Sequence, residues 1–82
     1  MADVLLHPDV DDWLDDQPDH LTERIRSKLA DAGEDPEHYL TPLAGRDTYR
    51  LRIGDYRAEI DWDQLDATLR VLQIGHRDGF YD

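Results

Sequence analysis

The sequence predicts a single α+β domain over residues 1–82, with a short first strand, a two-helix hairpin and then an antiparallel sheet of three to four strands. Apolar residues recur every three or four positions in the first half of the chain and every second position from residue 48 onward, which are the periods of a helix and of a strand. A chain of 82 residues rarely holds two cores. Because the sequence has no cysteine, disulfides and thiolate metal sites are excluded, and the domain depends on its apolar core.

The first strand is expected at residues 3–7, where Asp-Val-Leu-Leu-His is followed by Pro8. Proline ends the strand and suits the first position of a helix, because its φ is already fixed near the helical value. Val10, Trp13 and Leu14 then fall on one helical face. The first helix therefore begins directly after the first strand.

A second helix is expected to begin at Pro18, which breaks the pattern of the first. Its apolar residues repeat every three or four positions and are Leu21, Ile25, Leu29 and Ala32. Gly33 suits the C-terminal cap of this helix. Residues 34–46 contain two prolines and Gly45, and we expect them to form a loop that crosses to the sheet.

The second half of the chain is predicted to be an antiparallel meander. Its strands are expected at residues 49–53, 56–62 and 67–74. Gly54 and Asp55 suit the two-residue type II′ turn of a hairpin, since glycine accepts the positive φ at its first position. Residues 63–66 form a second turn. The last strand is apolar on both sides, which is typical of a strand with neighbours and cover on both faces.

The two-residue turn fixes the register of the hairpin. Arg52 then faces Arg57, and Arg50 faces Glu59, and residues that face each other share one side of the sheet. We call Arg50, Arg52 and Arg57 the arginine face. Like charges placed opposite each other destabilise a sheet, while arginine suits phosphate, so this face is a candidate nucleic-acid surface. An ordinary solvated face, in which Glu59 neutralises Arg50, explains the hairpin equally well.

The C-terminal residues 75–81 supply a second candidate site, with the sequence Gly-His-Arg-Asp-Gly-Phe-Tyr. His76 can carry a proton, Arg77 can bind a phosphate and Tyr81 can stack on a base. A surface histidine, a salt-bridged arginine and a packing tyrosine explain the same residues about as well. The histidines show no metal-ligand spacing, so the sequence predicts no metal site and no cofactor.

The chain is strongly acidic, with 20 Asp and Glu against 9 Lys and Arg and a net charge of −11. Its aromatic residues and ordered apolar spacing argue against disorder. Two alternatives remain, a docking face for a basic partner and an adaptation to high salt, because the acid-rich, lysine-poor composition resembles that of haloarchaeal cytoplasmic proteins. Near 1 M salt the Debye length is about 3 Å, so the negative total does not exclude a nucleic-acid substrate. With no long apolar run and no signal peptide, we expect a cytoplasmic protein.

Two stretches of the sequence resemble the RelE/ParE superfamily, toxins of type II toxin–antitoxin systems, and are most similar to its RelE-like members. They are Pro42-Leu43-Ala44-Gly45 with Tyr49-Arg50-Leu51-Arg52-Ile53-Gly54-Asp55-Tyr56-Arg57, and Ile74-Gly75-His76-Arg77 with Tyr81. The resemblance covers nearly the whole chain and implies the RelE-like fold. It also implies an endoribonuclease that enters the ribosomal A site and cleaves messenger RNA without metal, leaving a cyclic phosphate.

The resemblance assigns the catalytic positions residue by residue. The matching positions are Arg50, Arg52, Arg57, Arg77 and Tyr81. Arginine cannot serve as a general base, since its pKa stays above about 12. Glu59 and His76 are therefore the candidates for acid or base.

The resemblance also implies a set of partners. These are a cognate helical, RelB-like antitoxin, the ribosome and messenger RNA, with no membrane and no small-molecule cofactor. The alternative is a ParE-like or catalytically decayed member that binds a protein target such as gyrase without cutting RNA. The retained Gly-His-Arg and Tyr81 favour the nuclease, whereas the overall acidity departs from the basic character of most such toxins.

Overall fold

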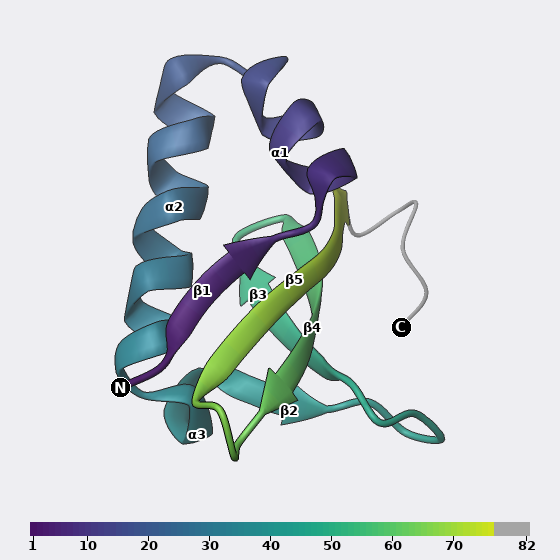
Figure 1. The fold of residues 1–82 in the computed structure, drawn as a ribbon. Coiled ribbons are helices and arrows are strands. Elements are labelled where there is room, and N and C mark those ends of the chain that lie inside the picture. The colour runs from purple at the N-terminus through teal and green to yellow at the C-terminus, as the bar shows by residue number, and fades with distance from the viewer. Residues whose placement is uncertain (77–82) are drawn as a thin grey trace.

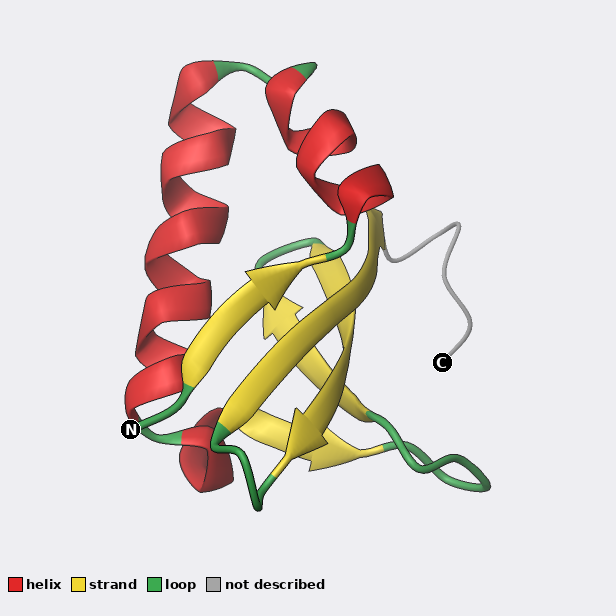
Figure 2. Cartoon of the chain, in the orientation of Figure 1, coloured by secondary structure: helices red, strands yellow, loops and turns green. Residues whose placement is uncertain are grey.

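The computed structural model describes residues 1–76, and within them five strands form one mixed sheet in the order β1-β5-β4-β3-β2 (Figure 1). The strands are β1 Asp3–Leu6, β2 Leu40–Pro42, β3 Tyr49–Ile53, β4 Tyr56–Asp63 and β5 Thr68–His76. The helices are α1 Pro8–Asp15, α2 Asp19–Glu34 and α3 Pro36–Tyr39. The α+β class and the helical hairpin of α1 and α2 are therefore confirmed (Figure 2). No helix in residues 1–76 is long and apolar enough to cross a membrane.

The first strand corrects the expectation of a purely antiparallel sheet. β1 pairs parallel with β5, from Asp3 opposite Thr68 to Leu6 opposite Val71. The backbone N–H of His7 extends this pairing by donating to the Val71 carbonyl at 3.0 Å. Apolar periodicity predicts that a segment is a strand but contains no information on the direction of its neighbour, which is why the sequence missed this feature.

The segment 34–46 is not the continuous loop that was expected. Pro36 lies in the first turn of the short helix α3, where its fixed φ fits, and β2 follows it. Leu40 of β2 faces Leu51 of β3 and is buried, so this short strand closes one edge of the core. A helix of four residues and a strand of three are too short to show their periods in a sequence.

Gly33 lies inside α2 and does not cap it, since Asp35 is the C-cap residue. The backbone N–H of Ala2 donates to the Gly33 carbonyl at 2.6 Å, and a Cβ on Gly33 would lie 2.9 Å from the Ala2 carbonyl oxygen. The glycine is therefore explained by the close approach of the β1 entry to the helix.

The core lies between the helical hairpin and one side of the sheet, as the sequence predicts. Its buried apolar residues are Val10, Leu14, Ile25, Leu29, Ala32, Leu40, Leu51, Ile53, Ala58, Ile60, Leu69 and Val71. Trp13 and Leu21 are partly buried against it. The Trp13 ring meets the edge of Tyr56 at a centroid distance of 5.8 Å, which joins α1 to β4.

The first turn of the meander lies where it was expected, whereas the second lies one residue further on, at residues 64–67 instead of 63–66. Gly54 has a φ of 59°, as the first position of a type II′ turn requires. In the second turn, the backbone N–H of Asp66 donates to Asp63 Oδ1 at 3.1 Å, which holds the pKa of the Asp63 carboxyl below its ordinary value of 3.8. The pairing of β4 with β5 shifts by one residue between Glu59 and Ile60, which is the signature of a β-bulge.

Candidate functional site

The arginine face lies on the side of the sheet opposite the core. Arg52 faces Arg57 and Arg50 faces Glu59, so the predicted register is confirmed. Arg52 is exposed, Arg50 is half-buried and Arg57 is 6% exposed. The three guanidinium groups therefore share one side of the β3–β4 hairpin but differ in how far each is available to a ligand.

Backbone carbonyl groups at the hairpin turn orient Arg57. Its Nη1 donates to the carbonyl oxygen of Tyr56 at 3.2 Å and to that of Gly54 at 3.4 Å. These contacts hold the guanidinium beside the turn. An arginine held in this way loses less conformational freedom when it binds an anion than an unrestrained one does.

Glu59 brings three further polar residues to the arginine face. Thr48 Oγ1 donates to Glu59 Oε2 at 2.6 Å, and Gln73 Nε2 donates to Oε1 at 2.7 Å. Arg46 Nη1 lies 3.5 Å from Oε2. Glu59 is only 6% exposed. The donors on its two oxygens replace the water that the carboxylate loses on burial.

His76 lies on the other side of the sheet from Glu59. It faces Tyr56 across the β4–β5 ladder, and the two rings meet edge to face at 5.4 Å. Tyr56 in turn contacts Trp13 of α1, so His76 belongs to the helix-covered side at the end of β5. Of the two acid–base candidates, the structure brings only Glu59 to the arginine face. Arg77 and Tyr81 lie outside the described residues.

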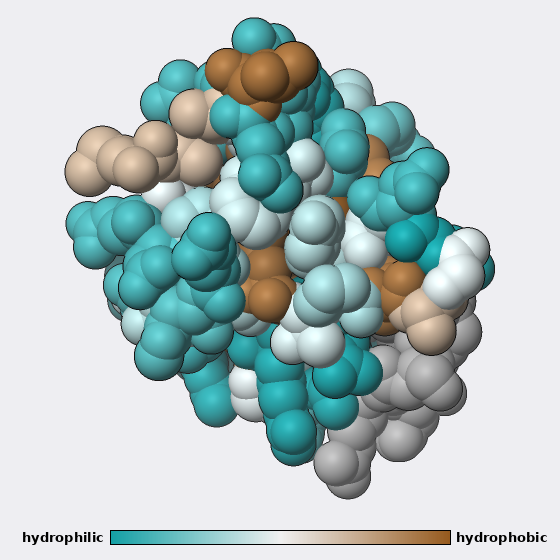
Figure 3. Space-filling view, turned by 90° about the horizontal axis from the view of Figure 1, so that it is seen from below, coloured by the Kyte–Doolittle hydropathy of each residue, from teal (hydrophilic) through white to brown (hydrophobic). Residues whose placement is uncertain are grey.

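Charge is unevenly distributed along the side of the sheet that carries the arginine face. Towards β1, Arg70 Nη1 lies 3.7 Å from a carboxylate oxygen of both Asp61 and Asp63, so its charge is balanced. Towards the hairpin turn, Arg52 and Arg57 face each other. The excess of positive charge on this side of the sheet therefore lies at the turn of the β3–β4 hairpin. Elsewhere, the view from below shows a mainly hydrophilic surface with separate apolar patches (Figure 3).

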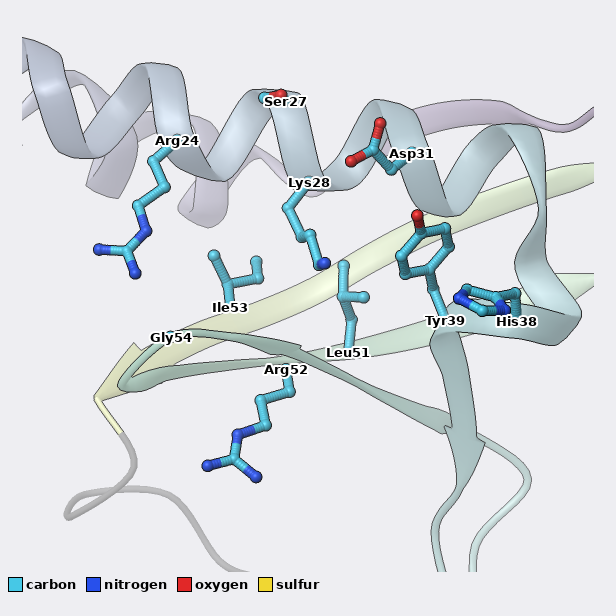
Figure 4. Close-up of a pocket in the computed structure, with 10 residues that line it drawn as sticks. All are labelled: Arg24, Ser27, Lys28, Asp31, His38, Tyr39, Leu51, Arg52, Ile53 and Gly54. Carbon is cyan, nitrogen blue, oxygen red and sulfur yellow. The ribbon is translucent and has the colours of Figure 1, made fainter.

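A groove of about 660 Å³ lies between α2 and β3 (Figure 4). Its lining residues are Arg24, Ser27, Lys28, Asp31, His38, Tyr39, Leu51, Arg52, Ile53 and Gly54. Arg24 and Lys28 extend from α2 towards the sheet, and Leu51 and Ile53 point back at them (Figure 4). The Lys28 ammonium lies 4.7 Å from the centroid of the Tyr39 ring. The groove thus has an apolar floor and a basic rim.

Comparison with known proteins identifies the family. The family model described as the ParE toxin of type II toxin-antitoxin system, parDE, matches residues 4–79. The chain belongs to this family. It is a toxin of the RelE/ParE superfamily, as its sequence motifs indicate. No curated protein matches the chain at a significant level.

Solved toxin structures share the fold of this toxin. The toxin–antitoxin complex RelBE2 from Mycobacterium tuberculosis matches with a TM-score of 0.83 at 22% identity, covering 93% of this chain and 98% of that one. The archaeal RelE–RelB complex from Pyrococcus horikoshii matches with a TM-score of 0.77 at 23% identity, covering 96% and 98%. Isolated E. coli RelE matches with a TM-score of 0.77 at 17% identity, covering 93% and 84%. At these identities the likeness establishes the RelE-like fold of the toxin.

Sequence reasoning missed Arg46 and Gln73 as members of this toxin's polar face. Gln73 is a polar residue of β5, but the pairing of β4 with β5 shifts by one residue between Glu59 and Ile60, so a regular hairpin does not place it opposite Glu59. Arg46 lies in the turn between β2 and β3, where no periodicity applies, so only the three-dimensional structure links it to Glu59. No group of three or more His, Asp or Glu side chains in residues 1–76 is arranged to hold a metal ion.

Proposed function

We propose that this toxin is a ribosome-dependent endoribonuclease that inhibits translation by cleaving messenger RNA without a metal ion. The observation that supports this best is the clustering of Arg50, Arg52 and Arg57 on one side of the hairpin. Arg52 and Arg57 face each other although that arrangement weakens the sheet. An anionic ligand offsets the repulsion, and the phosphates of a single RNA strand are such a ligand.

In the proposed reaction, the 2′-hydroxyl of the messenger attacks the adjacent phosphorus atom. The base, Glu59 or His76, takes the proton of the hydroxyl group as the O2′–P bond forms. The P–O5′ bond breaks, and the leaving 5′ oxygen takes a proton from the other of these two residues or from Arg77. Arg57 and Arg77 stabilise the charge that develops on the phosphate, while Tyr81 stacks on a base of the messenger.

The acidity of the toxin is compatible with this function in concentrated salt. A net charge of −11 repels RNA at low ionic strength. Near 1 M salt the screening length is about 3 Å, so distant acidic residues no longer act on the bound strand. Hydrogen bonds from the arginine face then carry the recognition. We propose that the toxin works in the salt-rich cytoplasm of a halophilic host.

A cognate RelB-like antitoxin is the partner that we propose for the groove between α2 and β3. The M. tuberculosis and P. horikoshii structures are toxin–antitoxin complexes. In this toxin the basic rim of the groove fits a segment with acidic side chains, and its apolar floor fits their apolar neighbours. β2 pairs with β3 only as far as Leu51, so in the described part of the chain β2 leaves the next residues of β3 uncovered beside the groove.

Charge reversal on α2 tests the antitoxin site. Arg24→Glu with Lys28→Glu should weaken antitoxin affinity by at least about tenfold, since it turns attraction across the groove into repulsion. The matched control is Arg26→Glu on the same helix, because Arg26 is half-exposed beside Asp11 and does not line the groove. Equal affinity for all three proteins would place the antitoxin elsewhere.

A second candidate function is binding of gyrase without RNA cleavage. The family model that matches residues 4–79 is that of the ParE toxin, which favours this alternative. Supercoiling by purified gyrase of the host distinguishes the two functions. Inhibition of supercoiling by the folded toxin, together with intact messenger on ribosomes, would establish the ParE-like function.

The nuclease function is tested with purified toxin and ribosomes carrying a defined messenger, in the salt of a halophilic host. We expect cleavage within the A-site codon, with a 2′,3′-cyclic phosphate on the upstream product. Cleavage of free RNA at the same rate would remove the ribosome from the mechanism. Intact messenger in the presence of folded toxin would leave the gyrase-binding function.

A further inference from the structure

The buried carboxylate of Glu59 is the least expected group on the arginine face. It lies in the middle of β4, opposite Arg50 and two residues after Arg57, and is 6% exposed. Burial of a carboxylate is costly unless hydrogen bonds and nearby charges compensate for the lost water. The bonds from Thr48 and Gln73, at 2.6 and 2.7 Å, are at the short end of the hydrogen-bond range and supply this compensation.

These contacts connect a loop to the centre of the sheet. Thr48 and Arg46 belong to the 43–48 loop, whereas Gln73 comes from the neighbouring strand β5. Within the loop, the Leu43 N–H donates to the Thr48 carbonyl at 3.0 Å and the Arg46 N–H donates to the Leu43 carbonyl at 3.2 Å. The loop therefore closes on itself. Glu59 holds the closed loop against β4 through its contacts with the Thr48 and Arg46 side chains.

The loop places a fourth arginine beside the arginine face. Arg46 Nη1 lies 3.5 Å from Glu59 Oε2, and the Arg46 side chain is 49% exposed. A guanidinium group has five N–H donors in a planar fork, so one edge can face the carboxylate while another faces a phosphate. Glu59 faces Arg50, and this pair lies farther from the hairpin turn than Arg52 and Arg57. Arg46, which lies beside Glu59, therefore extends the positive surface away from the turn.

We propose that Glu59 is a positioning residue, which fixes the 43–48 loop so that Arg46 binds a messenger phosphate next to those held by the arginine face. This inference rests on the proposed RNA-cleaving function and assigns the proton transfer to a group other than Glu59. Thr48 and Gln73 donate to the two oxygens of Glu59 and the residue is only 6% exposed, so little of the carboxylate is open to a 2′-hydroxyl. A positioning role uses the contacts as they stand.

Two substitutions at Glu59 separate positioning from proton transfer. Glu59→Gln keeps the shape, because its amide oxygen can face Thr48 and Arg46 while its amide N–H donates to the carbonyl oxygen of a flipped Gln73 side chain. We expect this variant to bind a single RNA strand within about threefold of the wild-type affinity and to keep the wild-type pH profile of cleavage, whereas loss of a general base changes that profile and costs about a hundredfold or more in kcat. A hundredfold fall in kcat with unchanged KM for Glu59→Gln would overturn the proposal.

The Arg46 contact is measured by binding to a single-stranded RNA that carries a 2′-deoxy residue at the cleavage site. Arg46→Ala and Glu59→Ala should each weaken binding by about tenfold, and the double variant should bind no worse than either. Each should also reduce the slope of log affinity against log salt by about 0.7, the contribution of one phosphate contact on a single strand. Additive losses, or an unchanged slope, would contradict positioning of Arg46 by Glu59.

Hydrogen exchange of the 43–48 amides tests the structural step without any RNA. Exchange should be faster in Glu59→Ala than in wild type and should return to the wild-type rate in Glu59→Gln. If Glu59→Ala does not fold, Thr48→Val removes one hydrogen bond and should have the same effect on a smaller scale. Unchanged exchange would refute the inference even if the toxin cleaves RNA. If exchange is faster in Glu59→Ala but the wild-type toxin binds no RNA, Glu59 positions the loop and the proposed function is rejected instead.

Discussion

Replacement of Arg52 by threonine should stabilise the fold while weakening the proposed RNA site. Arg52 is exposed and directly faces Arg57, so the native pair places two positive charges opposite each other. Threonine removes one of these charges and is itself favoured in strands. If this one substitution improves stability and reduces RNA binding, the Arg52–Arg57 pair weakens the sheet but contributes to binding of the ligand.

Arg50→Thr is the matched control. It lies on the same strand and the same face, and it changes the net charge by the same amount, from −11 to −12 (−11 − 1). Its partner across the ladder is Glu59, so it loses an attraction instead of a repulsion. A charge pair that faces across a sheet contributes about 0.2–1 kcal/mol. Because one variant loses a repulsion and the other an attraction, their stabilities should differ by about twice that, or about 0.4–2 kcal/mol.

Thermal unfolding followed by circular dichroism measures this difference. For a domain of this size, 1 kcal/mol shifts the midpoint by about 4–8 °C, so the variants should differ by about 2–16 °C, with Arg52→Thr higher. The measurement belongs at about 0.1 M salt, where exposed charges still interact. Equal destabilisation by both variants would refute the inference that Arg52 and Arg57 repel each other in the folded state.

Further predictions concern the core, the salt dependence and the C-terminal residues. Ile25→Ala should cost about 2–5 kcal/mol of unfolding free energy, because Ile25 is 0% exposed. Leu65→Ala is the control and should change little, because Leu65 is fully exposed. Equal thermal midpoints for the two variants would contradict the placement of α2. Raising salt from about 0.1 M to about 2 M should raise the thermal midpoint, and a midpoint independent of salt would make the acidic surface a binding surface instead. Tyr81→Ala should weaken RNA binding by about 1–3 kcal/mol and Tyr81→Phe by less, as stacking requires; equal losses in a binding titration would assign the role to the hydroxyl group. Arg77→Ala should abolish messenger cleavage while leaving circular dichroism and antitoxin binding unchanged.

The hairpin shows why part of the candidate site could be predicted from the sequence. A two-residue turn at Gly54 and Asp55 leaves one register, and the register decides which side chains share a face. The arginine face therefore follows from local rules alone. The α2 residues that pack on the sheet follow from their helical period in the same way.

The features that the sequence missed depend on contacts between distant segments. The parallel pairing of β1 and the position of Gly33 both arise where the chain entry meets residues far along the sequence. The contacts of Glu59 join Thr48 and Gln73, which are 11 positions before it and 14 after it. Such contacts have no periodic signal, so a polar residue in a loop cannot be told from a solvated one before the fold is known.

The rate of A-site messenger cleavage by Arg52→Ala, compared with Arg70→Ala, tests the central claim most directly. Both substitutions remove one arginine from the same side of the sheet, but Arg70 lies between Asp61 and Asp63, away from the hairpin turn. If the arginine face stabilises the charge that develops on the scissile phosphate, Arg52→Ala should cleave about a hundredfold more slowly than wild type, and Arg70→Ala should cleave at nearly the wild-type rate. Equal rates for the two variants, with both proteins folded, would contradict the assignment of the arginine face as the catalytic surface.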